Sequence, residues 1–284
     1  MFFIVDKPLG ISSNLVVKIL KRVLKVEKIG FAGTLDPLAT GLMIIGTEGS
    51  PRLFPLLENL PKKYRAIIRL DGTTNSFDLE KPVEHVDISE STLEWLTQQK
   101  IEWVLTGHFI GDIMQIPPLY SAVWIDGRRA YELARKWQDM TIHPKKRTVY
   151  SYSILSYRWP SLDIEITVSS GTYIRSIARD LGIFLETGGY LEKLERLSIG
   201  HMTMDTHLWM QHNDIRYAPI SHEVLFPNIQ VLELSPEEKM HLRLGSTPLS
   251  TPQENGKYFI IYDDNTYGLL EARDWLLFPL KNVV

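Results

Sequence analysis

Cysteine is absent from this chain of 284 residues, which excludes disulfides, thiolate nucleophiles and zinc sites built on cysteine. The eight histidines are scattered, without the His-x-x-x-His spacing that is typical of a metal motif. A glycine pattern typical of nucleotide-binding loops is absent as well. We therefore expect neither a metal nor a cofactor.

Long apolar runs are also absent. No stretch approaches the roughly 18 residues that a membrane-spanning helix needs, and the N-terminus lacks the basic and then apolar layout of a signal peptide. We expect a cytoplasmic protein without a membrane partner. With 44% hydrophobic residues, the chain is long enough to bury the core of one large domain and of a second, small one.

Basic residues are not in excess, since the net charge is −3, but they are unevenly distributed. Residues 1–70 contain eleven Lys and Arg against five Asp and Glu, and residues 126–150 contain seven against three. Residues 71–125, between them, contain two against nine. A partner responds to the local potential, so the two basic segments fit an RNA-binding face. They fit ordinary solvated surfaces equally well.

Hydrophobic periodicity predicts both strands and helices. Strands are expected at residues 2–5, 42–45, 62–70 and 162–169, and helices at 15–24, 92–99 and 174–185. The helix at 15–24 is amphipathic with a basic outer side, and residues 12–14 offer side chains that can cap it. Residues 228–284 show a strand-rich pattern broken by turns.

The most unusual stretch is residues 30–43, GFAGTLDPLATGLM. Its three glycines and one proline permit sharp turns and close backbone approach. We expect a shaped loop that holds one carboxylate, Asp36, ahead of a strand. Taken alone, an Asp-Pro pair in a glycine-rich turn is more often structural than catalytic.

Several motifs, in one order along the chain, resemble those of the TruB family of tRNA pseudouridine synthases. They are KPLGISS at 7–13, GTLDP at 33–37, KKY at 62–64, GTTNSFD at 72–78, QIPPLYSAV at 115–123, DGRRAYELAR at 126–135, GTYIR at 171–175 and LERLSIG at 194–200. The resemblance implies an α+β fold with a mixed, largely antiparallel central sheet flanked by helices. It also implies a catalytic domain at 1–227 and a shortened, β-rich, PUA-like RNA-binding domain at 228–284.

The resemblance also assigns roles to individual residues. It implies that Asp36 is the essential carboxylate and that Arg175 is the cation paired with it. The catalytic set that it implies is Asp36, Tyr64, Tyr173 and Arg175, and the substrate-binding set is Lys7, Phe31, Tyr64, Tyr173 and Leu194. In these roles Tyr64 and Leu194 hold the extruded base, because an aromatic ring can replace stacking contacts that a flipped base has lost.

Three positions depart from the family pattern. Phe31 stands where the family usually has His, and it can fill the space left by a flipped base without donating a hydrogen bond. Asn75 replaces a usual Asp and removes a charge. Glu195 replaces the first Arg of a Leu-Arg-Arg motif, which is expected to cost a phosphate contact if the usual Arg makes one.

The function implied by the resemblance is isomerisation of uridine to pseudouridine in tRNA, at uridine-55 of the T stem-loop. The LATG sequence after Asp36 and the short C-terminus favour a stand-alone enzyme that acts as a monomer without guide RNA. Two alternatives are a non-catalytic tRNA binder or folding chaperone with the same pocket, and a nucleoside hydrolase that releases free uracil. Asp36 could attack the sugar, add to the uracil ring or remove a sugar proton, and the sequence leaves these routes open.

Overall fold

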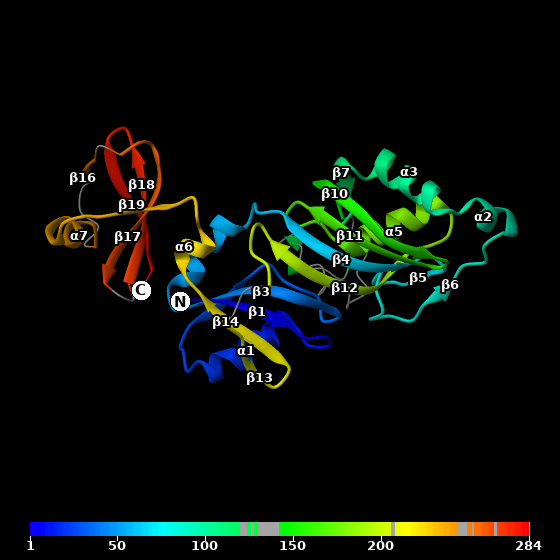
Figure 1. Ribbon diagram of the computed structural model, residues 1–284, viewed down its shortest axis with the longest axis horizontal. Helices are drawn as coiled ribbons and strands as arrows, with labels where there is room; N and C mark the ends of the chain where they lie inside the picture. Colours follow the sequence, from blue (N-terminus) through cyan, green and yellow to red (C-terminus); the bar gives the residue numbers. More distant parts are fainter. Residues whose placement is uncertain are drawn as a thin grey trace.

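Two β-sheets and the helices packed on them make up the structure (Figure 1). It is a computed structural model that describes residues 1–284 except 120–123, 126–127, 130–141, 206–207, 244–248, 252, 264–265 and 284. The five-stranded sheet lies at one end of the long axis, and the ten-stranded sheet forms the rest of the body.

The large sheet is mixed and mainly antiparallel. In spatial order its strands are β13 (Met210–His212), β14 (Ile215–Ile220), β1 (Phe2–Lys7), β3 (Ala39–Thr47), β12 (Tyr190–Ile199), β4 (Lys62–Arg69), β11 (Ser161–Val168), β10 (Lys145–Arg158) and β7 (Gly111–Gln115), with β2 (Ile29–Ala32) paired to β3 off this path. Among the described strands of this sheet, only β3 and β12 pair in parallel. The fold class predicted from the sequence is therefore confirmed.

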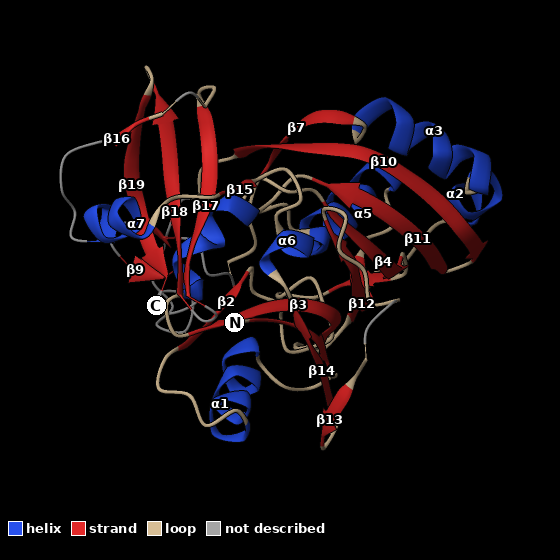
Figure 2. Cartoon of the chain, turned by 60° about the vertical axis from the view of Figure 1, so that its left-hand side comes forward, coloured by secondary structure: helices blue, strands red, loops and turns tan. Residues whose placement is uncertain are grey.

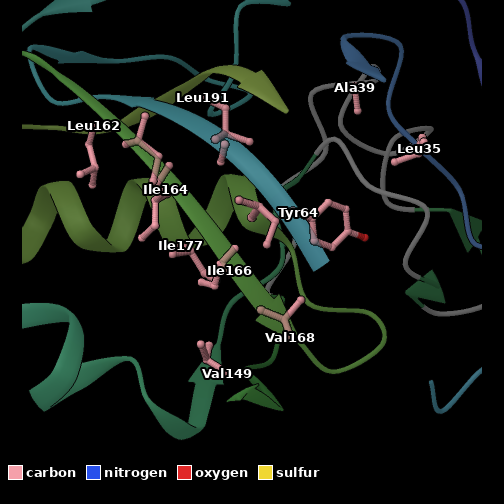
Figure 3. Close-up of a cluster of buried hydrophobic side chains, with 14 of the residues drawn as sticks. Leu35, Ala39, Tyr64, Val149, Leu162, Ile164, Ile166, Val168, Ile177 and Leu191 are labelled. Atoms are coloured by element: carbon pink, nitrogen blue, oxygen red, sulfur yellow. The ribbon is translucent and has the colours of Figure 1, made fainter. Parts of the chain in front are cut away.

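One face of this sheet carries the main helices. α1 (Ser13–Val23), α3 (Gln98–His108) and α5 (Ile174–Leu185) contribute side chains to one continuous hydrophobic core. Figure 3 shows part of this core, in which aliphatic side chains of β11 and α5 extend towards Tyr64. The strand residues in this core alternate with residues of the other face: Phe3 and Val5 face the helices, whereas Phe2 and Ile4 face away from them.

Local sequence explains the start of α1. The Ser12 hydroxyl accepts a hydrogen bond from the Leu15 backbone N–H at 3.2 Å, so one of the expected residues is the cap. The region 79–112 differs from the expectation of a single helix at 92–99. It contains α2 (Glu90–Trp95) and then α3, because Thr97 accepts a hydrogen bond from the Lys100 N–H and begins a new helix.

The opposite face of the large sheet packs on the 3₁₀ helix η1 (Ser50–Leu57) and on the C-terminal sheet. A second core cluster joins Phe2 and Leu53 to Phe226, Phe259 and Leu269. The two sheets are thus connected through apolar side chains as well as through the chain, by way of α6 (His222–Leu225).

The C-terminal sheet has the order β15 (Gln230–Leu232), β17 (Gly256–Asp263), β18 (Thr266–Arg273), β19 (Leu276–Val283) and β16 (Leu249–Ser250), with α7 (Pro236–Arg243) beside it (Figure 2). Two short ribbons, β5 (Gly72–Thr73) with β6 (Glu84–His85) and β8 (Trp124–Ile125) with β9 (Arg128–Arg129), complete the strands. β8 and β9 pair with each other on either side of Asp126 and Gly127. These two residues, and the DGRRAYELAR motif from residue 130 onwards, lie outside the described residues.

A glycine permits the parallel contact between β3 and β12. Gly41 has φ of +97°, and a Cβ there would lie 2.9 Å from the Arg196 nitrogen and closer still to the Arg196 carbonyl oxygen. Gly41 pairs with Arg196 in the register. A side chain at this position would separate the two strands that carry residues 39–41 and 194–196.

We expect Gly41→Ala to lower the free energy of unfolding by at least about 2 kcal/mol, because it adds backbone strain to a backbone clash. Urea denaturation followed by circular dichroism measures the loss. The matched control is Gly107→Ala in α3, where a Cβ meets nothing within 4 Å and helix propensity favours Ala by roughly 0.5–1 kcal/mol. Equal stability of the two variants would contradict this assignment.

Candidate active site

A cavity of about 260 Å³ opens where the loop before β3 meets β4, β12 and the start of α5. It is lined by Gly33, Thr34, Leu35, Asp36, Lys62, Tyr64, Ser170, Gly171, Thr172, Tyr173, Ile174, Arg175, Leu194 and Arg196. These residues come from four segments that are distant in sequence, and the sheet register brings them together.

The loop that carries Asp36 is held from both sides. Ser13, at the start of α1, donates a hydrogen bond to the Leu35 carbonyl at 2.8 Å and accepts one from the Leu35 N–H at 2.9 Å. The Ala39 N–H donates to the Asp36 carbonyl at 3.0 Å, which closes a turn around the proline. The Asp36 carboxylate is therefore presented on a fixed backbone.

Lys7 completes this support. Its ammonium is buried and donates hydrogen bonds to three carbonyl oxygens: those of Ala39 at 2.6 Å, Pro8 at 2.9 Å and Pro37 at 3.2 Å. Burial lowers the pKa of Lys7 to about 8, although the nearby Asp36 carboxylate opposes this. Lys7 was predicted to bind substrate. The structure directs its three donors to the loop backbone, and Lys7 is not among the residues that line the cavity.

The Arg175 guanidinium links two carboxylates. Its Nε lies 3.0 Å from Asp36 Oδ2 and 3.6 Å from Asp78 Oδ2, and its Nη1 donates to the Ser76 carbonyl at 2.9 Å. Arg175 and Asp78 are both buried. The structure thus pairs Arg175 with Asp36, the two residues that the resemblance joins, and adds a second carboxylate, Asp78.

Asp78 is a residue beside the site that the sequence analysis did not single out, as are Lys62 and Arg196 in the cavity lining. Asp78 Oδ1 accepts hydrogen bonds from the Ser76 hydroxyl at 2.6 Å and from the Glu80 N–H at 3.0 Å, which fixes the carboxylate behind Arg175. The available signal was its place as the last residue of the GTTNSFD motif at 72–78. Asn75, the departure within that motif, is exposed.

The surroundings of Asp36 oppose its ionisation on balance. Its side chain keeps 36% of its accessible surface, towards the cavity, but the atoms packed around the carboxylate displace most of its water. Burial raises the pKa of Asp36 above the ordinary value of 3.8, the Asp78 charge raises it further, and Arg175 and Lys7 lower it. The cations are thus what favours the anion in this site.

The predicted base-holding residues are neighbours on one face of the adjacent strands β4 and β12, in the wall of the cavity. Tyr64 is 9% exposed, and Figure 3 shows its hydroxyl directed away from the aliphatic side chains of β11. Leu194 pairs with Ala66 on β4 and with Ala39 on β3. Both residues line the cavity, where the Tyr64 ring and the Leu194 side chain offer a surface on which a flat ring can pack.

Tyr173 precedes the first residue of α5 and also lines the cavity. The buried amide of Gln115, the last residue of β7, donates to the Tyr173 carbonyl at 3.0 Å and accepts from the Tyr173 N–H at 2.9 Å. This double hydrogen bond fixes the backbone where the strand-to-helix junction enters the site.

Phe31 and Glu195 also lie outside the cavity lining. Phe31 lies on β2 opposite Ile45, and it packs against the main core. Glu195 pairs with Arg65 on β4. Because successive residues of a strand point to opposite faces, Arg65 and Glu195 lie on the face of the sheet opposite to Tyr64. The replacement of Arg by Glu at 195 therefore does not alter the charge of the cavity lining.

The described part of the chain contains no group of three or more His, Cys, Asp or Glu side chains arranged to hold a metal ion. None of its helices combines the length and apolar composition needed to cross a membrane.

Comparisons with known proteins agree on one family. A family model described as TruB family pseudouridylate synthase (N terminal domain) matches residues 21–174. The chain is 35% identical to tRNA pseudouridine synthase B of Aquifex aeolicus (strain VF5), over 99% of this chain and 98% of that protein. It is 43% identical to tRNA pseudouridine synthase B of Parabacteroides distasonis, over 66% of this chain and 78% of that protein.

Solved structures share the fold. A chain in the crystal structure of a Cbf5-Nop10-Gar1 complex superposes with a TM-score of 0.53 at 29% identity, over 72% of this chain and 50% of that chain. The chain thus spans half the length of that relative. A chain in an H/ACA RNP bound to a substrate RNA containing 2′-deoxyuridine superposes with a TM-score of 0.64 at 19% identity, over 99% of this chain and 85% of that chain.

We expect two substitutions beside Asp36 to shift its pKa in opposite directions. Lys7→Met removes a positive charge and raises the pKa, so that the carboxyl stays protonated to a higher pH. Asp78→Asn removes a negative charge, keeps the side-chain shape and lowers the pKa. Titration of the Asp36 carboxyl carbon by NMR measures both shifts.

Asp112→Asn is the matched control, because this exposed carboxylate pairs with Lys146 and lies outside the cavity lining. It is expected to leave the Asp36 titration unchanged. A shift of the same sign in the Lys7 and Asp78 variants would show that charge does not control this carboxyl.

Proposed function

The chain belongs to the TruB family of pseudouridylate synthases, and we propose that it isomerises uridine to pseudouridine in tRNA, at uridine-55 of the T stem-loop. The observation that carries this proposal is the Asp36–Arg175 ion pair in a cavity that also presents Tyr64, Leu194 and Tyr173. The relatives that match most of the chain are named for tRNA, which supports tRNA as the substrate.

The reaction breaks the bond between uracil N1 and the sugar carbon, turns the base and joins its C5 to the same carbon. The C5 proton leaves and N1 gains a proton, so no electrons or groups are gained overall. The chemistry therefore calls for a nucleophile or base, a proton acceptor and a site that holds the detached ring.

The base must first leave its stack, at a cost of a few kcal/mol that contacts in the cavity offset. Tyr64 and Leu194 hold the extruded ring. Asp36 then acts as the nucleophile, and each of its three routes requires the ionised carboxylate. Arg175 stabilises and orients that anion. Tyr173 contacts Asp36 or the nucleotide, and Tyr64 or water accepts the C5 proton.

We also propose that the enzyme acts as a cytoplasmic monomer without guide RNA. The similarity to a tRNA pseudouridine synthase B extends over nearly the whole chain, whereas the chain in the Cbf5-Nop10-Gar1 complex is matched over half of its length. Residues 228–284 are proposed to be a PUA-like RNA-binding domain that follows a catalytic domain at 1–227. The separate five-stranded sheet supports this division.

Asp36→Asn is expected to eliminate pseudouridine formation while tRNA binding stays within about tenfold, because the amide keeps the shape of the side chain without the anion. Tritium release from tRNA that carries 5-tritiated uridine measures turnover, and filter binding measures affinity. Asp87→Asn, at an exposed carboxylate, is the matched control and should behave as the unaltered protein.

Sequencing of pseudouridine in tRNA from a strain that lacks this protein tests the site of modification. Turnover by the Asp36→Asn variant, or release of free uracil by the unaltered enzyme, would reject the proposed reaction. Pseudouridine that persists at position 55 in the deletion strain would reject the proposed target.

Phe31→His is expected to keep catalysis and to change RNA affinity, because residue 31 packs against the core outside the cavity lining. Single-turnover rates at saturating protein separate the chemical step from binding. Loss of the single-turnover rate would place residue 31 in the chemistry.

A further inference from the structure

Three buried cations lie close together at the catalytic cavity. Lys7, Lys62 and Arg196 are 0%, 7% and 1% exposed. The strand register places them near one another: Lys7 pairs with Gly41 on β3, Gly41 pairs with Arg196 on β12, and Arg196 pairs with Tyr64, two residues from Lys62 on β4. The Arg196 charge also lowers the pKa of both lysines. Lys7 is occupied with the backbone of the Asp36 loop, so the other two cations require a separate explanation.

Arg196 uses only part of its guanidinium for the fold. Its Nε donates to the Leu42 carbonyl at 2.7 Å and its Nη2 donates to the Gly33 carbonyl at 3.0 Å. Its Nη1 lies beside Gly33, 3.4 Å from where a Cβ would stand on that exposed residue. Since a guanidinium has five N–H groups, further donors remain in the wall of the cavity that Arg196 lines.

Lys62 is arranged in the same way. Its ammonium donates to the Leu60 carbonyl at 2.8 Å and to the Glu58 carbonyl at 3.1 Å, which leaves one of three donors. Burial, and then the Arg196 charge, lower the pKa of Lys62 to about 8. Lys62 also lines the cavity.

Neither cation has a carboxylate within ion-pair distance among the described residues. The ion pairs found there include Arg175 with both Asp36 and Asp78, but none that involves Lys62 or Arg196. Burying two like charges in one cavity wall with no carboxylate in ion-pair contact is costly, although the more distant Glu58 charge acts on Lys62. The cost is offset if an anion from outside completes the site.

The positions of the two cations relative to the base-holding residues identify that anion. Lys62 is two residues from Tyr64 on β4, and Arg196 is two residues from Leu194 on β12. Arg196 pairs with Tyr64 in the antiparallel register, so both cations are displaced in the same direction along the sheet. The displacement is about 7 Å, a spacing that the ribose of a nucleotide can bridge.

We propose that Lys62 and Arg196 form a phosphate-binding subsite that holds one backbone phosphate next to the nucleotide whose base packs on Tyr64 and Leu194. The subsite rests on the proposed function, since it takes its ligand from the same RNA. Arg196 supplies planar N–H groups and Lys62 a point charge, the two kinds of donor that bind phosphate oxygens. By holding this phosphate, the subsite positions the sugar so that the glycosidic carbon stays beside Asp36.

The test uses stem-loop RNAs in which one linkage, 5′ or 3′ to the target uridine, is a neutral methylphosphonate. Binding is measured by fluorescence anisotropy with Asp36→Asn protein, so that no turnover interferes. One of the two replacements should weaken binding about tenfold, the effect of losing one charged hydrogen bond. The same replacement should weaken binding by Lys62→Met protein clearly less than tenfold, because the Lys62 contact is already lost and only the Arg196 contact remains to be removed.

Lys63→Met is the matched control. Lys63 is the next residue of β4, faces the other side of the strand and pairs with Glu165. This variant should keep the tenfold response to the neutral linkage, as should Lys62→Arg, which retains the charge and also shows that the site tolerates substitution. Equal responses in the Lys62→Met, Lys62→Arg and Lys63→Met proteins, or no response in any, would overturn the subsite.

Turnover by the unaltered enzyme on the unmodified stem-loop separates this proposal from the previous one. If the uridine is not converted, the proposed function fails whatever the linkage does. The other outcome is that the uridine is converted while the neutral linkage has the same effect on the Asp36→Asn protein as on the Lys62→Met, Lys62→Arg and Lys63→Met proteins. In that case the function stands and the subsite fails.

Discussion

The site depends on one buried guanidinium shared by two carboxylates. Arg175 comes from α5, Asp36 from the loop between β2 and β3, and Asp78 from the turn after β5, so the contact exists only when three distant segments have assembled. Removing one member would leave a buried charge without its partner, which costs far more than an exposed ion pair contributes. Catalytic geometry and the fold are therefore stabilised by the same interaction.

The remainder of the large sheet maintains this contact. The parallel pairing of β3 with β12 brings the end of the Asp36 loop against the strand that carries Leu194 and Arg196. β12 is also antiparallel to β4, which places Tyr64 opposite Arg196. The cavity therefore has one wall made of regular strands and another made of a glycine-rich loop, and the Lys7 ammonium and the Ser13 hydroxyl hold that loop in place.

The secondary-structure elements with clear local periodicity, and the site residues that belong to recognisable motifs, could be predicted from the sequence. Alternation at 62–70 corresponds to β4, helical spacing at 174–185 corresponds to α5, and the matched motifs supply Asp36, Tyr64, Tyr173, Arg175 and Leu194, which the structure brings to one cavity. The single helix expected at 92–99 was wrong, because a capping Thr97 divides the region in a way that a weak apolar pattern does not show.

Long-range contacts account for what could not be predicted. Asp78 belongs to the site because it pairs with Arg175, which is distant in sequence. Lys7 donates hydrogen bonds to carbonyl oxygens that a strand and a loop bring together only in the folded chain. The orientation of Glu195 away from the cavity follows from the pairing of β12 with β4, and a single sequence does not specify that pairing. The boundary at 227 stays a prediction.

The position of β1 has a consequence for synthesis of the protein. This buried apolar strand lies between β3, which follows it within fifty residues, and β14, whose residues that pair with β1 begin only at Arg216. During translation, one edge of β1 can be covered early by β3, while its other edge stays open until β14 has left the ribosome. The nascent chain thus exposes a hydrophobic strand edge long after the neighbouring strand has been made.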